Sequence, residues 1–238
     1  MSDYRIGLIT EGVTDQYIIE KIVRTLLPNK RFVFTHLSPT ETEIKDQKKK
    51  DGFGWGGVYR VCKRLQEKLE IAKMTDSTFD LIIIHIDGDV MMLTYDSSRI
   101  IPKDQDGKLP CYSESNSLSE NCRRLRSVVE SWNEATDQKA AYCIPYINTD
   151  AWAAYMLYDS RRGELNEGLD KNSLNGILLS VGKREGKLIR KKGNEIKKLK
   201  PGYYDAGDQL NGKILAEMRV WFTQLDLFCE EITQAFIF

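Results

Sequence analysis

The chain has 238 residues, of which 41% are hydrophobic, so it is long and apolar enough to form one large α/β domain with a buried core. Its 35 basic residues balance 35 acidic ones, so the net charge does not identify a class of partner. The first residues predict no signal peptide, and no apolar stretch approaches the roughly 20 residues of a membrane span, so we expect a protein that does not cross a membrane. The five cysteines show no zinc spacing, and their odd number favours a reducing cytoplasm.

The N-terminal segment predicts a strand, an acidic turn and a helix. Residues 4–10 predict a short strand, and Glu11 follows it in a turn. We expect Thr14 to cap the helix and Asp15 to lie in its first turn, where a negative charge suits the helix dipole. Apolar residues then recur at helical spacing as far as Pro28. This is the first βα unit of a doubly wound sheet, with Glu11 at the carboxyl end of its strand.

The next segment predicts a second strand and a second helix. Residues 32–37 are expected to form the strand, and the lysine-rich residues 40–51 a loop. Glycine-rich residues 52–57 then open a helix whose apolar positions continue to Leu69. Such a helix start can bring backbone amides to a phosphate, although a flexible joint is the simpler interpretation.

Residues 81–89, with the sequence LIIIHIDGD, contain the strongest functional signal. A near-continuous apolar run is typical of a strand covered on both faces of a parallel sheet. Ligands of such sheets bind beyond the carboxyl ends of the strands, where Asp87 and Asp89 are expected to lie. His85, one of only two histidines, is interpreted as a core histidine with satisfied hydrogen bonds. The two carboxylates can converge on one hard cation such as magnesium.

The middle of the chain predicts a long irregular segment, a helix, a strand and a further helix. Residues 90–117 lack periodicity, and Ser117 with Glu120 forms a capping box at the start of an amphipathic helix. Residues 140–147 contain a proline and are predicted to form a strand near an edge of the sheet. Asp150 follows at a strand-to-helix junction, either as a third site carboxylate or as ordinary first-turn charge.

The C-terminal part contains a basic segment and an apolar tail. Residues 183–200 are interpreted either as a solvated loop or as a contact to a phosphate backbone. The basic residues expected to bind nucleic acid are Lys183, Arg184, Lys187, Arg190, Lys191, Lys192, Lys197 and Lys198. Residues 208–238 predict one long amphipathic helix that packs on the main domain, and its aromatic content also allows self-association or binding of a partner chain.

Carboxylates are expected to gather at one edge of the sheet. The central ones are Glu11, Asp87 and Asp89, joined by Asp15 and Asp150. Several carboxylates repel one another unless a cation neutralises them, and one or two magnesium or manganese ions are the simplest compensation. Two such ions can activate a water molecule and stabilise the leaving oxygen in phosphodiester cleavage.

Two motifs resemble the Toprim family. The EGVTD turn at Glu11, with an aspartate four residues after the glutamate, resembles the first Toprim motif, and Asp87-Gly88-Asp89 after an apolar strand resembles the Toprim Asp-x-Asp motif. The resemblance covers roughly residues 1–160 and implies a Toprim/Rossmann-like α/β domain. Residues 161–238 then form a basic loop and a helical extension packed on it.

The chain looks most similar to stand-alone Toprim proteins related to the OLD-family nucleases. This resemblance implies a magnesium- or manganese-dependent nuclease of DNA or RNA that works with an ABC/SMC-type ATPase subunit in defence against phage. Glu11 would be a metal ligand or the acid/base group, and Asp87 and Asp89 would be metal ligands. Asp15 and Asp150 would help bind a second ion, although Asp150 stands where these relatives usually have the longer glutamate.

Two alternatives remain open at this stage. An apolar strand followed by Asp-Gly-Asp-Val also resembles the nucleophile motif of haloacid-dehalogenase phosphatases, in which Asp87 would attack phosphorus. That motif normally lies on the first strand, whereas the first strand here is followed by Glu11. The other alternative is a Toprim-like module that binds nucleic acid or protein without catalysis.

Overall fold

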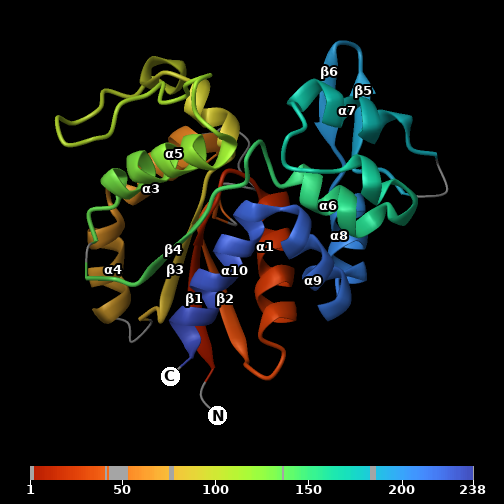
Figure 1. Cartoon of the computed structure of the whole chain (residues 1–238). Coiled ribbons are helices and arrows are strands. Elements are labelled where there is room, and N and C mark those ends of the chain that lie inside the picture. Colours follow the sequence, from red (N-terminus) through yellow and green to blue (C-terminus); the bar gives the residue numbers. More distant parts are fainter. Residues whose placement is uncertain are drawn as a thin grey trace.

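A computed structural model of the chain describes residues 3–40, 42, 53–74, 78–135, 137–182 and 186–237. Its centre is an all-parallel sheet of four strands with helices on both faces, as in Rossmann-like folds (Figure 1). The strands, in spatial order, are β2 (Phe32–Ser38), β1 (Tyr4–Ile9), β3 (Leu81–His85) and β4 (Ala140–Cys143). The predicted α/β class with a parallel sheet is therefore confirmed.

The strand order reverses between β1 and β3. From β1 the chain crosses to β2 through α1 (Val13–Leu26), and it returns through α3 (Gly54–Cys62) and α4 (Leu65–Met74) to place β3 on the other side of β1. The two crossovers lie on opposite faces of the sheet (Figure 1). In doubly wound sheets this reversal opens a crevice beyond the carboxyl ends of the two strands, which is the usual place for a ligand.

β3 is buried because its side chains enter two separate cores. Leu81 and Ile83 face the core that contains α1, whereas Ile82 and Ile84 face the core that contains α3 and α4. Side chains of a strand alternate between the faces of the sheet, so a strand covered on both faces must be apolar at nearly every position. This is the physical reason for the run of isoleucines before Asp87.

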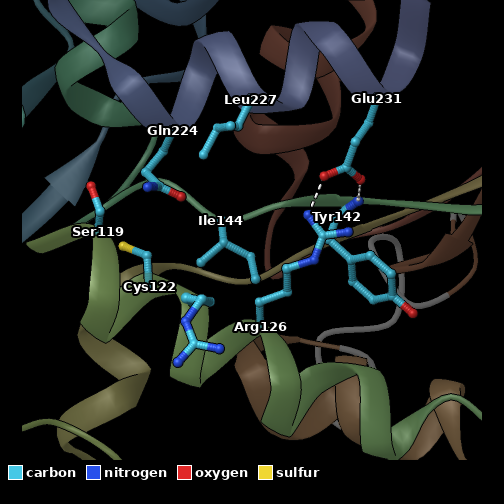
Figure 2. Close-up of a pocket in the computed structure, with 9 residues that line it drawn as sticks. Ser119, Cys122, Arg126, Tyr142, Ile144, Gln224, Leu227 and Glu231 are labelled. Carbon is cyan, nitrogen blue, oxygen red and sulfur yellow. Dashed lines mark hydrogen bonds and ion pairs between the residues drawn. The ribbon is translucent and has the colours of Figure 1, made fainter. Parts of the chain in front are cut away.

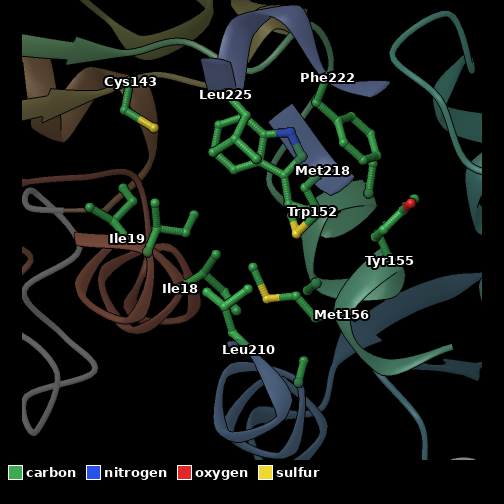
Figure 3. Close-up of a cluster of buried hydrophobic side chains, with 14 of the residues drawn as sticks. Ile18, Ile19, Cys143, Trp152, Tyr155, Met156, Leu210, Met218, Phe222 and Leu225 are labelled. Carbon is green, nitrogen blue, oxygen red and sulfur yellow. The ribbon is translucent and has the colours of Figure 1, made fainter. Parts of the chain in front are cut away.

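The larger core joins α1 to helices from the second half of the chain. These helices are α6 (Asp150–Leu157), α8 (Lys200–Gln209), α9 (Gly212–Trp221) and α10 (Thr223–Phe236). Figure 3 shows Trp152 of α6 among Ile18 of α1, Met218 of α9 and Leu225 of α10. The C-terminal helices thus pack against the α/β part, while the proposed boundary near residue 160 stays a prediction.

The smaller core lies between the sheet and α5 (Leu118–Trp132). Trp132 is fully buried there, and its indole N–H donates to the Tyr95 hydroxyl over 2.9 Å. Tyr95 belongs to η3 (Tyr95–Ser98), which follows η2 (Gly88–Met92) in the long irregular segment. Ser117 accepts a hydrogen bond from the Glu120 amide over 3.2 Å, so the predicted helix start is confirmed.

Several local predictions are wrong at helix ends. The N-cap of α1 is Gly12, and Thr14 lies inside the helix. The single helix expected up to Leu69 is divided into α3 and α4 around Lys63. β4 is an edge strand as predicted, but it ends at Cys143 instead of continuing to residue 147. Most of the predicted loop at residues 40–51 lies outside the described residues.

The C-terminal segment is more ordered than its composition suggests. β5 (Ile189–Lys192) and β6 (Glu195–Lys198) form an antiparallel hairpin where a loop was expected, next to α7 (Lys171–Ser180) (Figure 1). The single helix predicted for residues 208–238 is instead α9 and α10, which meet at Phe222. Phe222, at the junction, has a non-helical backbone and a fully buried side chain.

All five cysteines are buried and free. Within the described ranges, no helix combines the length and the apolar character needed to cross a bilayer. η4 (Asp159–Glu164) connects α6 to the segment before α7.

Gly88 provides a test of how tightly the Asp-Gly-Asp segment is packed. A Cβ atom at this position would lie 1.8 Å from the Tyr146 backbone oxygen, so we expect Gly88→Ala to lower the free energy of unfolding by about 1–3 kcal/mol or more. Gly176→Ala is the matched control, because Gly176 lies in α7 with open space around it. It should stabilise the protein by up to about 1 kcal/mol. Chemical denaturation measures both; equal effects would contradict the close approach.

Candidate active site

Glu11 and Asp87 meet across the strand-order reversal. Glu11 follows β1 and Asp87 follows β3, and the Glu11 Oε1 atom accepts a hydrogen bond from the Asp87 backbone amide over 2.8 Å. The two carboxyl groups therefore belong to the same crevice, as their positions at the ends of neighbouring strands suggest. The bond also orients the Glu11 side chain along the edge of the sheet.

The environment of Glu11 favours its neutral form. Burial and the nearby charge of Asp87 raise the pKa of Glu11 well above its usual range, and only the hydrogen bond from the Asp87 amide opposes this shift. Burial also raises the pKa of Asp87, with Asp15 adding to the shift and His85 opposing it. These groups are therefore costly to ionise unless positive charge comes close.

Asp15 and Asp150 face the same crevice from two helices. Asp15, in the first turn of α1, accepts a hydrogen bond from the Thr149 hydroxyl over 2.5 Å. Asp150, the first residue of α6, accepts a hydrogen bond from the Tyr203 hydroxyl over 2.7 Å. Although burial opposes its ionisation, Asp15 has a lowered pKa because of Lys198, His85 and Thr149. Asp15 is thus held as a carboxylate.

Lys198 supplies positive charge to this pair. Its Nζ atom lies 2.7 Å from Asp150 Oδ1 and 3.9 Å from Asp15 Oδ1, and its side chain is 38% exposed. Although burial opposes the charged form, Asp150 and Asp15 raise the pKa of Lys198 well above its usual range. Lys198 was expected to contact a phosphate backbone, but its ammonium group faces carboxylates within the crevice.

Asp89 lies at the rim of the crevice. Its Oδ2 atom forms an ion pair with Lys171 Nζ over 2.7 Å, and the Lys171 side chain is 60% exposed. Lys171 is the first residue of α7, so this contact ties the C-terminal part to the Asp-Gly-Asp segment. The structure therefore brings all five predicted carboxylates to one region, with Asp89 in its most accessible part.

His85 corrects the sequence-based interpretation, because it is buried without satisfied hydrogen bonds. Its Nε2 atom lies 3.3 Å from Asp87 Oδ1. Within the described part of the chain, neither this oxygen nor either ring nitrogen has a hydrogen-bond partner. His85 and Asp87 are two residues apart at the end of a strand, which places their side chains on one face. That spacing is the signal by which His85 could have been included from the sequence.

Three side chains of the crevice fit a metal ion. Asp15, His85 and Asp87 each offer a donor atom, and these atoms all lie within 4.8 Å of one another. Two carboxylates and one imidazole form a donor set typical of divalent-metal sites, and the unpartnered atoms of His85 and Asp87 lack another partner among the described residues. Glu11 lies outside this group of three and next to it, through its bond to the Asp87 amide.

The basic residues predicted to bind nucleic acid lie mainly on the β5–β6 hairpin. Arg190, Lys191, Lys192 and Lys197 are exposed there, and Lys187 is partly buried before it. Lys183 and Arg184 lie outside the described residues. Lys198, the last residue of β6, pairs with Asp150 of the crevice. The exposed cations of the hairpin therefore lie close in the chain to a residue that contacts the acidic group.

A basic cavity of about 410 Å³ lies at the start of α3. Arg60, Arg99 and Ser98 line it together with the first turn of α3, whose start has no side-chain cap. The Gly54 amide donates to the Glu11 backbone oxygen over 2.9 Å, so the cavity adjoins the acidic crevice. Phosphate groups bind readily where arginine side chains and a helix N-terminus converge.

A different cavity, of about 280 Å³, lies between α5 and α10 beside the edge strand β4 (Figure 2). Arg126 and Glu231 form an ion pair across it, and Glu231 also accepts a hydrogen bond from the Tyr142 amide over 3.1 Å. Both charged groups of this ion pair are therefore already partnered, and Glu231 also binds the edge strand. The cavity shares no residue with the acidic crevice.

Comparisons with protein-family models, with curated proteins and with solved structures found no match for this chain. The resemblance to Toprim proteins therefore rests on the two motifs alone. The roles that it implies for the carboxylates stay predictions, whereas their gathering in one crevice is a property of the fold.

The raised pKa of Glu11 predicts a pH-dependent gain in stability for Glu11→Gln. Glutamine can still accept the Asp87 amide bond, and it removes a group whose ionisation opposes folding as the pH rises above about 4.3, the ordinary pKa of glutamate. In metal-free buffer the variant should melt higher at pH 8, by about 2–4 °C for each kcal/mol gained, and the gain should shrink towards pH 5. The exposed Glu114→Gln is the control; a gain independent of pH would contradict the raised pKa.

Proposed function

We propose that this chain is a divalent-metal-dependent nuclease that hydrolyses phosphodiester bonds in DNA or RNA. The observation that carries the proposal is the convergence of Glu11, Asp87 and Asp15 at the strand-order reversal. Burial disfavours the ionised forms of Glu11 and Asp87, so a cation beside them would favour ionisation. Asp89 and Asp150 extend the same acidic surface towards solvent and towards α6. An acidic surface that binds metal ions suits a phosphodiester substrate, because the phosphate oxygens can also bind those ions.

The proposed metal is magnesium or manganese, held by Asp87 and Asp15 with His85 beside them. When bound, such an ion would lower the pKa of a water molecule and neutralise charge on the phosphate. Glu11 is placed to accept a proton from that water or to orient it, since the Asp87 amide fixes its carboxyl group. Lys171 carries positive charge at the rim, where a phosphate would approach.

A polyanionic substrate fits the surroundings of the crevice. Exposed cations of the β5–β6 hairpin lie on one side of it, and the cavity that contains Arg60 and Arg99 lies beside Glu11. A strand of nucleic acid that crosses the crevice would place phosphates against both basic surfaces. This arrangement supports a phosphodiester substrate over a small phosphate monoester.

Loss of nicking activity in site variants tests the proposal. Purified protein with magnesium or manganese should nick supercoiled DNA or degrade RNA, and chelation should stop the reaction. Asp87→Asn and Glu11→Gln should each lower the rate by about 10²–10⁴-fold, the range expected for a positioned acid or base. Asp205→Asn, an exposed change on α8, should leave the rate unchanged. Equal rates in all three variants would contradict the assignment.

The same assay distinguishes the alternatives. Hydrolysis of a phosphate monoester without nicking would favour a phosphatase with Asp87 as nucleophile, and tight binding without hydrolysis would favour a binding module. The ATPase partner and the role in phage defence implied by the resemblance are part of the proposal. If they are correct, a partner ATPase should raise the nicking rate of the chain.

The hairpin predicts a salt-dependent contribution to nucleic-acid binding. Lys192→Gln should weaken binding to any sequence about equally and reduce the slope of log affinity against log salt by roughly 1, because one phosphate contact is lost. Lys73→Gln, on α4 at the opposite side of the molecule, should leave the slope unchanged (Figure 1). Fluorescence anisotropy with labelled DNA at several salt concentrations measures both; identical slopes would exclude Lys192 from the interface.

A further inference from the structure

Building on the proposed function, we infer that His85 is a direct metal ligand and that the site of Asp15, His85 and Asp87 prefers manganese, or another divalent ion that accepts nitrogen ligands, over magnesium. The inference starts from the burial of His85, which is completely inaccessible to solvent. Buried polar groups in folded proteins almost always have a hydrogen-bond partner. Both nitrogens of His85 and the Asp87 Oδ1 atom are exceptions among the described residues.

The spacing of the unpartnered atoms suits two ligands of one ion. Donors bound at about 2.1 Å lie roughly 3.0 Å apart when they subtend a right angle at the metal and about 3.4 Å apart at the tetrahedral angle. The distance from His85 Nε2 to Asp87 Oδ1 is 3.3 Å, and the Asp15 donor lies within 4.8 Å of both. A small shift of one side chain would therefore complete a three-donor site.

A proton shared between His85 and Asp87 is the competing explanation. The contact does not have the geometry of a hydrogen bond, and the second ring nitrogen would stay unpartnered within the described residues even if it had. Lys198 lies 3.9 Å from Asp15 Oδ1 but is not a hydrogen-bond partner of either His85 nitrogen or of Asp87 Oδ1. These features favour a cation in the crevice over an isolated ion pair.

The donor set determines which cation fits best. Magnesium selects oxygen ligands in a nearly octahedral arrangement and keeps several waters. Imidazole suits zinc, iron, nickel and copper, whereas carboxylates suit magnesium and manganese. Manganese accepts carboxylates and, as a first-row transition ion, also binds sites with nitrogen ligands, whereas magnesium selects oxygen. Of the two metals in the proposed function, one imidazole with two carboxylates therefore favours manganese.

Pulsed electron paramagnetic resonance of bound Mn²⁺ tests the inference directly, because an imidazole nitrogen on the metal gives a nitrogen hyperfine signal. The untagged chain is suited to this measurement, since it contains only His36 and His85. Wild type, His36→Gln and His85→Gln are each loaded with Mn²⁺ in the presence of excess Mg²⁺. His36 is the matched control, because it lies on β2 and pairs with Glu20 over 2.7 Å.

We expect the nitrogen signal in wild type and in His36→Gln and its loss in His85→Gln. The Mn²⁺ affinity of His85→Gln should fall by at least the roughly 10–100-fold that loss of an outer-shell partner costs, with a much smaller change for Mg²⁺. Absence of the signal in wild type, or its persistence in His85→Gln, would overturn the inference. The wild-type spectrum keeps the test decisive even if the variant is unstable.

Nuclease activity is measured on the same samples, and its outcome is separate. A nitrogen signal without cleavage would support the metal ligand and contradict the proposed function. Cleavage with Mg²⁺ at the wild-type rate in His85→Gln, without a nitrogen signal in wild type, would support the nuclease and overturn the role of His85.

Discussion

Repulsion among buried carboxylates is the constraint on which this structure depends. Glu11, Asp15 and Asp87 lie where two parallel strands end, and each ionised group makes the next one harder to ionise. Compensation comes from distant parts of the chain, since Lys198 ends the hairpin and Lys171 begins α7. The C-terminal segment is therefore part of the electrostatics of the crevice as well as part of the core. Binding of a cation would reduce the repulsion among these carboxylates.

The sequence predicts the central sheet well because its signals are physical and local. The isoleucine run of β3 must be covered on both faces, and the 3.6-residue spacing of α1 and α5 must bury one side of each helix. Predictions failed where tertiary packing determines the outcome. Phe222 enters the core and divides an apparently continuous helix, and the basic segment pairs with itself as a hairpin in spite of its charge.

The same distinction applies to the crevice. Glu11 and Asp87 could be placed together from the sequence because carboxyl ends of neighbouring parallel strands share an edge. The position of Lys198 could not, because it depends on tertiary contacts that bring the end of β6 to Asp15 of α1 and Asp150 of α6. His85 was misjudged because burial of a histidine was taken to imply satisfied hydrogen bonds. A buried side chain can lack hydrogen-bond partners, and only the three-dimensional structure shows whether it does.

The close approach at Gly88 has a consequence for the ancestry of this chain. The backbone of Tyr146 fills the space that any side chain at Gly88 would need, so the close approach of these two segments requires the glycine, whatever the chemistry of the site. A related protein without these carboxylates would still need the glycine for this close approach. A buried apolar strand followed three residues later by such a glycine is therefore a feature by which related proteins without the carboxylates could be identified.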